Sequence, residues 1–196
     1  MIKRDADGII QREMPEVSIR SVDSDKRTAE LSFSSEEPYT RYGVKEILDH
    51  GPGACDLKRL RSIGCVLFNH NKDKVIGKIL SADIKDGRGV ATVQFDDDET
   101  SQEIFAKVKS GTLKGVSVGY IVSNWEYVDA GAKSTDKRFE GECEIARKWT
   151  PLEISIVSIP ADPTVGVGRS YSAGNSLETR ERHIQLNKNI SRRYER

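Results

Sequence analysis

Short apolar or alternating runs separated by turn residues constrain the fold of this chain most strongly. These runs lie at residues 16–19, 28–34, 65–68, 75–80, 90–95, 115–128 and 149–159. An alternating run places its apolar side chains on one face of a strand, and the clusters of Gly, Asp and Pro between runs favour hairpin turns. The sequence therefore predicts a meander of short strands, which makes a mainly antiparallel β protein.

One helix of appreciable length is predicted after these first strands. Residues 96–98 place acidic groups at its positive end, Thr100 and Glu103 have the spacing of a capping box, and Gly111 ends it. Two shorter helical segments are predicted at residues 43–49 and 55–61. The expected fold class is thus α+β, with a few helices around a β body.

Composition narrows the function classes. The 196 residues carry 31 Lys and Arg against 31 Asp and Glu, so no global charge favours nucleic acid or an anionic membrane. The three cysteines match neither a zinc ribbon nor a redox C-x-x-C motif, and a reducing cytoplasm is the simplest compartment. No apolar run approaches the roughly 18 residues of a spanning helix, and the amino terminus lacks the apolar core of a secretion signal.

The domain organisation follows from the same composition. Residues 1–15 are charged and without period, so we expect a loose N-terminal arm. Residues 16–168 are expected to form one domain, in which the polar stretch 129–142 is an exposed loop. Residues 169–196 are predicted to be a flexible tail or linker, because a polar and mildly basic composition cannot form a core.

Ser117 lies at the centre of the strand 115–122 with a glycine at each second neighbour, Gly115 and Gly119. A glycine inside a strand often marks a position where a ligand or another backbone approaches closely. Ser117 is therefore a candidate nucleophile beside room for a substrate. A small polar residue packed against a neighbouring strand is the alternative interpretation.

The three histidines differ in their surroundings. His183 lies in the tail, and His50 follows a predicted helix in a glycine-rich turn, where we expect a solvated side chain. His70 is carried by the apolar strand 65–68 to a polar turn at residues 72–74. An imidazole at that position could accept a proton near neutral pH, although a structural role stays open.

Glu153 interrupts the apolar strand 149–159 and shares a face with Ser155. A carboxylate on such a strand is seldom buried without a partner. The partner could be a Lys or Arg in a buried ion pair, or an imidazole. The sequence leaves both open.

The sequence contains few signals for a metal or cofactor site. Asp73 follows His70 at the third position, and residues 96–99 are acidic, but the chain has no H-E-x-x-H motif, paired cysteines or calcium-loop spacing. The acidic run is better explained as the start of a helix. Residues 166–168 lack the third glycine of a dinucleotide fingerprint, so no cofactor and no metal are predicted.

Three motifs carry a resemblance when they are taken in order. They are Asn69-His70-Asn71, Gly115-Val116-Ser117-Val118-Gly119-Tyr120, and the segment from Glu153 to Pro163. Together they resemble the prohead proteases of tailed bacteriophages, and the segments 31–38 and 103–108 are similar to that family as well. The resemblance runs from about residue 16 to residue 165.

This resemblance implies a serine endopeptidase inside the immature capsid, in the cytoplasm of the bacterial host. Such an enzyme trims major capsid protein and scaffold segments and cuts itself. The balanced charge and the lack of a spanning apolar run predict no nucleic-acid and no membrane partner. The implied fold is similar to herpesvirus assemblin, a β-barrel surrounded by helices, whose members include dimers. The oligomeric state of this chain stays open.

The resemblance also implies roles for individual residues. Ser117 is the nucleophile and His70 its general base. The third member of the assemblin triad is a histidine, and Glu153 stands at that position here. A glutamate can orient the imidazole, while Asp73, Glu144 or a water are the alternatives.

Two other functions compete with the protease. One is a catalytically silent assembly factor of the same fold that binds capsid or scaffold segments along a strand edge. The other is a metal-dependent hydrolase that uses His70 and the acidic run.

The donors of an oxyanion hole stay open. Pro160 and Pro163 have no N–H, so the donors after Glu153 could only be Ala161, Asp162 or later residues. Residues 189–196 are expected to be a self-cleavage segment or a junction to a fused capsid or scaffold domain.

Overall fold

The computed structural model describes residues 10–13, 19–41 and 43–158. In chain order its elements are β1 (Ile10–Glu13), β2 (Ile19–Asp23), β3 (Thr28–Ser35), β4 (Tyr39–Arg41), β5 (Val44–Leu48), α1 (Lys58–Ile63), β6 (Cys65–Phe68), β7 (Asn71–Lys85), β8 (Arg88–Phe95), α2 (Glu99–Lys109), β9 (Gly115–Val128) and β10 (Cys143–Val157). The described residues are thus mainly β, with two helices, as the sequence predicts for an α+β chain.

The chain divides into two compact units. The first contains Met1–Ser35, Asp56–Ile121 and Thr150–Thr164, and the second contains Glu36–Cys55, Val122–Trp149 and Val165–Arg196. Strands β9 and β10 contribute residues to both units.

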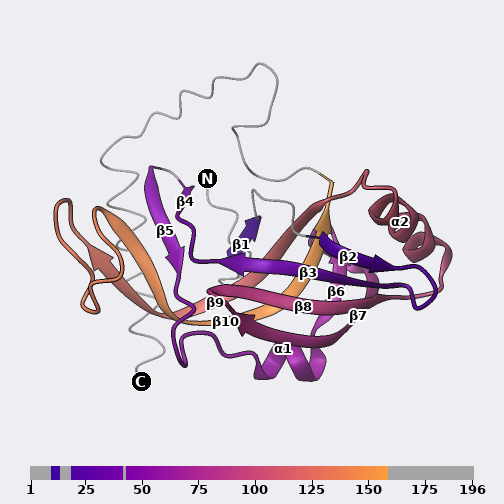
Figure 1. Ribbon diagram of the computed structural model, residues 1–196, viewed down its shortest axis with the longest axis horizontal. Coiled ribbons are helices and arrows are strands. Elements are labelled where there is room, and N and C mark those ends of the chain that lie inside the picture. The colour runs from indigo at the N-terminus through magenta and orange to yellow at the C-terminus, as the bar shows by residue number, and fades with distance from the viewer. Residues whose placement is uncertain (1–9, 14–18, 42, 159–196) are drawn as a thin grey trace, which may run out of the picture. The chain divides into compact units, whose positions relative to one another are not determined.

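In the first unit, β2, β3, β8, β7 and β6 are successive antiparallel neighbours. Figure 1 shows β3, β8 and β7 side by side. Asp86 and Gly87 connect β7 to β8 with φ values of +52° and +68°. Positive φ at both central residues is the requirement of a type I′ turn, for which Asp-Gly is a favoured pair. The predicted meander and this predicted hairpin are confirmed.

Helix α2 contacts β7 and β8 in the first unit. Its buried side chains include Ile104, Phe105 and Val108, the apolar stripe of the predicted helix. The N-cap is Asp98, whose carboxylate accepts a hydrogen bond from the Ser101 N–H at 3.1 Å. The predicted capping box was therefore wrong, because the helix begins one residue before Thr100 and an aspartate caps it at least as well.

Strand β10 pairs in parallel with β6 in the first unit, with Ser155 opposite Leu67. The sheet order continues from β6 through β10 to β9 and then β1. Strand β9 reaches Val128 as predicted, whereas β10 begins at Cys143, six positions before the predicted start at Trp149. The parallel pairing places the carboxyl end of β6 beside the last residues of β10.

In the second unit, β5 replaces the helix predicted at residues 43–49. It pairs in parallel with β10 and antiparallel with β4. Val44, Ile47 and Leu48 are buried there. A run of five residues is too short for its period to separate helix from strand, so the available partner strands decided its conformation.

The segment between β9 and β10 is only partly the exposed loop that the sequence predicts. Lys133 and Glu140 form an isolated antiparallel bridge, and Ser134 is buried. Ser134 donates a hydrogen bond to Asp136 at 2.7 Å and accepts one from the Phe139 N–H at 3.0 Å. The segment is therefore anchored by its own polar groups.

Part of the expected loose arm forms a strand. Residues 10–13 pair antiparallel with β9, from Ile10 opposite Tyr120 to Glu13 opposite Ser117.

The expected tail at 169–196, including 189–196, lies outside the described residues, as do Ala161 and Asp162. The single domain at 16–168 and the assemblin-type barrel stay predictions. Among the described residues, no helix is long and apolar enough to cross a membrane.

Candidate active site

A two-residue hairpin presents His70. Phe68 of β6 pairs with Asn71 of β7, so Asn69 and His70 are the central residues of the turn. Their φ values are +53° and +56°, as a type I′ turn requires. The turn predicted at residues 72–74 was wrong, because those residues already belong to β7. The turn lies directly after the apolar strand that the sequence predicts.

Positive φ is costly for a residue with a Cβ, on the order of 1–3 kcal/mol when the conformation is imposed. Hydrogen bonds to β10 and to the residue after it hold this turn. The Asn69 N–H donates to the Ile156 carbonyl at 2.9 Å, and the Asn69 Oδ1 accepts from the Ser158 N–H at 2.9 Å. The backbone position of His70 is therefore fixed by the parallel pairing of β6 with β10.

His70 joins the side chains of Ser117 and Glu153. Its Nε2 lies 2.6 Å from the Ser117 Oγ, and its Nδ1 lies 2.6 Å from the Glu153 Oε1. If Nδ1 carries the proton and donates to the carboxylate, Nε2 is free to accept the hydroxyl proton. All three predicted site residues thus form one chain of hydrogen bonds within the first unit.

Ser155 is a further member of this cluster that the sequence reasoning did not assign. Its hydroxyl donates to the Glu153 Oε2 at 2.7 Å and accepts a hydrogen bond from the His70 N–H at 3.1 Å. The signal was present, because a period of two places Ser155 on the same strand face as Glu153. Ser155 links the carboxylate to the backbone of the histidine.

The two glycines beside Ser117 make room for β10. A Cβ at Gly119 would collide with the carboxylate of Glu153, and a Cβ at Gly115 would lie 2.8 Å from both the Val157 Cγ2 and its carbonyl oxygen. The sequence predicts space for a substrate backbone at these positions. The structure corrects that interpretation, because Glu153 and Val157 fill the space.

The site is largely enclosed. Ser117 has an exposed fraction of 0%, and the side chains of His70 and Glu153 are 10% and 15% exposed. Burial, and then the negative charge of Glu153, raise the pKa of the nearby Cys65 thiol. The Cys65 side chain is therefore a protonated neighbour of the site at neutral pH.

The remaining candidates lie elsewhere. His50 is buried in the second unit, with its Nδ1 2.8 Å from the Leu48 carbonyl and its ring edge-on to Trp149, so the expected solvated histidine was wrong. Asp73 is exposed on β7, and Glu144 belongs to the second unit. Within the described ranges, no group of three acidic, His or Cys side chains could hold a metal ion.

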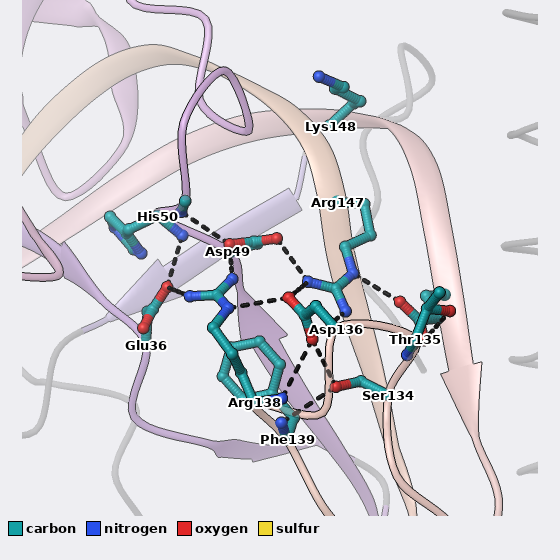
Figure 2. A network of polar contacts seen from close by, with 12 residues as sticks. Glu36, Asp49, His50, Ser134, Thr135, Asp136, Arg138, Phe139, Arg147 and Lys148 are labelled. Carbon is teal, nitrogen blue, oxygen red and sulfur yellow. Dashed lines mark hydrogen bonds and ion pairs between the residues drawn. The ribbon is translucent and has the colours of Figure 1, made fainter.

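A second polar cluster, here called the arginine network, lies entirely in the second unit. Its members are Glu36, Asp49, Glu126, Asp136, Arg138 and Arg147. Figure 2 shows the carboxylate of Asp49 between the two guanidinium groups. Arg147 donates to Asp49 at 2.7 Å and to Glu126 at 2.6 Å. The network borders a cavity of about 400 Å³.

The arginine network holds the carboxylates of Asp49 and Asp136 in the charged form. Burial alone raises the pKa of Asp49, but hydrogen bonds from Arg147, the Gly51 N–H and Arg138 outweigh burial and keep that pKa below its usual value. Hydrogen bonds from Arg147 and Arg138 hold the pKa of Asp136 far below its usual range. Four carboxylates against two guanidinium groups leave no positive excess for an anionic ligand.

Comparisons with known proteins place this chain in a family. The chain is 38% identical over 155 residues to a protein named major capsid protein of the Halomonas phage phiHAP-1. The match covers 76% of this chain but 24% of that relative, so the chain spans about a quarter of its length. No solved structure matches the chain. The sequence model of the caudovirus prohead serine proteases matches residues 32–178, and the chain therefore belongs to this family.

Proposed function

We propose that this chain is a serine endopeptidase of prohead maturation in which Ser117 is the nucleophile, His70 the general base and Glu153 the residue that orients the base. The observation that carries the proposal is the uninterrupted chain of hydrogen bonds, 2.6 Å from the Ser117 Oγ to the His70 Nε2 and 2.6 Å from the His70 Nδ1 to the Glu153 Oε1. Acyl transfer by serine needs these three functions in this order.

In the proposed reaction, the Ser117 Oγ forms a bond to the carbonyl carbon of the scissile peptide while His70 takes the hydroxyl proton at Nε2. Glu153 stabilises the resulting imidazolium. The C–N bond then breaks, and His70 returns the proton to the departing amine. A water, deprotonated by the same Nε2, hydrolyses the acyl-enzyme and restores Ser117. General base catalysis of this kind contributes roughly 10²–10⁴-fold.

The anchored hairpin supports this role for His70. A base must be held in a narrow geometry, because a displacement of about 1 Å can cost roughly 10²-fold in rate. The His70 N–H is fixed by Ser155, and the preceding residue, Asn69, is fixed by β10. The imidazole therefore starts from a backbone position with little freedom.

The proposed substrates are the major capsid protein, scaffold segments and the chain itself, inside the prohead in the cytoplasm of the bacterial host. Family membership supports this assignment. The relative named major capsid protein is about four times as long as the matching segment. This supports the further proposal that protease and capsid segments are joined in one polypeptide in some members.

Co-expression with the major capsid protein of the same phage tests the proposal. We expect chelator-resistant cleavage that falls by roughly 10⁴-fold or more in Ser117→Ala and in His70→Ala. Ser123→Ala is the matched control, because Ser123 lies on the same strand and makes only a 3.4 Å contact with the Lys148 carbonyl. Cleavage that persists in Ser117→Ala would contradict the proposal.

A second candidate is the silent assembly factor, which the complete enclosure of Ser117 favours. In that case, wild type and Ser117→Ala would bind capsid protein equally, and neither would cut it. If the chain were instead a metal-dependent hydrolase, a chelator would stop cleavage and Ser117→Ala would still cleave.

Mass spectrometry of the carboxyl termini of wild type and Ser117→Ala tests self-cleavage in the tail.

A further inference from the structure

The edge of β9 beside Ser117 is occupied by the chain's own amino-terminal segment. Strand β9 has β10 on one side and β1 on the other, and β1 is the terminal strand of this sheet. The pairing is antiparallel and short, from Ile10 opposite Tyr120 to Glu13 opposite Ser117. The last residue of β1 is thus paired with the proposed nucleophile.

In this structure the site is closed to a protein substrate. Ser117, Val118 and Tyr120 each have an exposed fraction of 0%, and Ile10, which pairs with Tyr120, has an exposed fraction of 4%. Attack on a peptide bond requires the carbonyl carbon to come within about 3–3.5 Å of the serine oxygen. A segment next to Ser117 must therefore move before cleavage.

Strand β10 is poorly suited to be that segment. It is paired with β6, and it carries the Glu153 carboxylate and the Ser155 hydroxyl that hold His70. Moving it would dismantle the site. Strand β1, in contrast, contributes four residue pairs and lies at the end of the sheet. Short edge strands are the elements that open at the lowest free-energy cost.

We propose that residues 10–13 are an intramolecular peptide ligand of the β9 edge, and that a protein substrate binds the same edge as an extended antiparallel strand after displacing them. Main-chain hydrogen bonds supply the affinity in this mode of recognition. The direction of β1 places the residues before Glu13 along Val118 to Tyr120. Substrate residues on the amino side of the scissile bond take these positions. The substrate part rests on the proposed protease function.

Binding in the absence of catalysis tests the occupancy. The full chain with Ser117→Ala is compared with the same chain carrying Gln11→Pro and Arg12→Pro, since proline removes the N–H groups needed for pairing. A fluorescent peptide copy of residues 6–16 is the probe, and a scrambled peptide is its control. We expect the proline variant to bind the probe at least about tenfold more tightly, because its edge is free. Prolines at Asp5 and Ala6, outside β1, are expected to leave affinity unchanged.

Hydrogen exchange locates the change. Among residues 117–120, the alternate amides that face β1 are expected to exchange faster in the proline variant and to regain protection when the probe is added. Ile10→Ala, a milder change that shortens a buried side chain, is expected to shift both readouts in the same direction by less. Equal probe affinity in the parent, the proline variant and Ile10→Ala would overturn the proposal. Equal amide protection of residues 117–120 in these three proteins would overturn it as well.

Catalysis separates this inference from the protease function. With Ser117 intact, Gln11→Pro and Arg12→Pro are expected to lower KM for a capsid-derived peptide by about tenfold and to leave kcat unchanged. An altered probe affinity without cleavage in any variant would refute the protease and retain the intramolecular ligand. Normal cleavage with unchanged KM and unchanged probe affinity would refute the intramolecular ligand and retain the protease.

Discussion

Two carboxylates in this molecule are similarly buried but have different partners. The side chain of Glu153 in the first unit is 15% exposed, and that of Asp49 in the second unit is 8% exposed. Glu153 accepts from an imidazole and a serine hydroxyl, whereas Asp49 accepts from two guanidinium groups. A guanidinium stays charged at any physiological pH, but an imidazole can gain or lose a proton.

This difference separates a group of residues that can move a proton from one that holds its charges fixed. In the arginine network, the pKa of Asp49 and that of Asp136 are both lowered, so their carboxylates stay ionised and anchor the segment before β10. At Glu153 the carboxylate faces a base that is itself hydrogen-bonded to a hydroxyl. The first arrangement suits stability, and the second suits acyl transfer.

Among changes to the two carboxylates and their surroundings, the largest effect is expected for Glu153→Gln. The amide keeps the size of the side chain but removes the charge that favours the Nδ1–H tautomer and the imidazolium. We expect kcat to fall by roughly 10³–10⁴-fold with little change in KM. Steady-state kinetics on a capsid-derived peptide measure this.

The matched control for that change is Glu30→Gln, an exposed carboxylate whose ion pair with Arg20 is 3.9 Å long. It should leave kcat unchanged. A Glu153→Gln enzyme with near-normal kcat would show that the Glu153 carboxylate has only a structural role. Glu153 and Asp49 would then not differ in function.

A smaller loss of activity is expected for Gly119→Ala. The new Cβ would collide with the Glu153 carboxylate, which must shift away from His70. We expect kcat to fall by roughly 10²-fold. Gly115→Ala provides the comparison, because its Cβ would press on Val157 instead of Glu153. It should lower the melting temperature but have little effect on kcat per folded molecule. Equal activity losses in the two variants would refute a specific effect through Glu153.

Arg147→Met is expected to act on stability alone. It removes the partner of Asp49, Glu126 and Asp136 and leaves buried negative charge uncompensated. The free energy of unfolding should fall by about 3 kcal/mol, measured by urea denaturation. Arg20→Met, which breaks an exposed pair, should cost no more than about 1 kcal/mol. Activity per folded molecule should be unchanged in both.

The smallest effect concerns pH. Because the pKa of Asp49 is lowered in the folded chain, its carboxylate stabilises the fold fully above the unfolded value near 3.8, and this contribution is lost as pH falls through the folded pKa. The difference in unfolding free energy between wild type and Asp49→Asn should therefore be about 2 kcal/mol at neutral pH and shrink below pH 3.8. A difference that is constant down to pH 2 would contradict this account.

Local signals in the sequence were sufficient for much of the first unit. The Asp86-Gly87 turn, the alternation through β8 and the acidic start of α2 each act over a few residues, so they could be read without tertiary information. Ser117 and His70 could be singled out because each is a polar residue within or directly after an apolar strand. Their hydrogen bond follows from sheet order, which no local pattern contains.

The sequence by itself thus determined the β-rich character, the main helix and the three polar residues that stand out from apolar strands. Only the tertiary structure decided that β5 is a strand, that residues 10–13 pair beside Ser117, and that Glu153 faces an imidazole rather than a guanidinium. The physical reason is range: turns and caps form between near neighbours, whereas parallel pairing of β10 with β5 and β6 joins residues far apart in the chain.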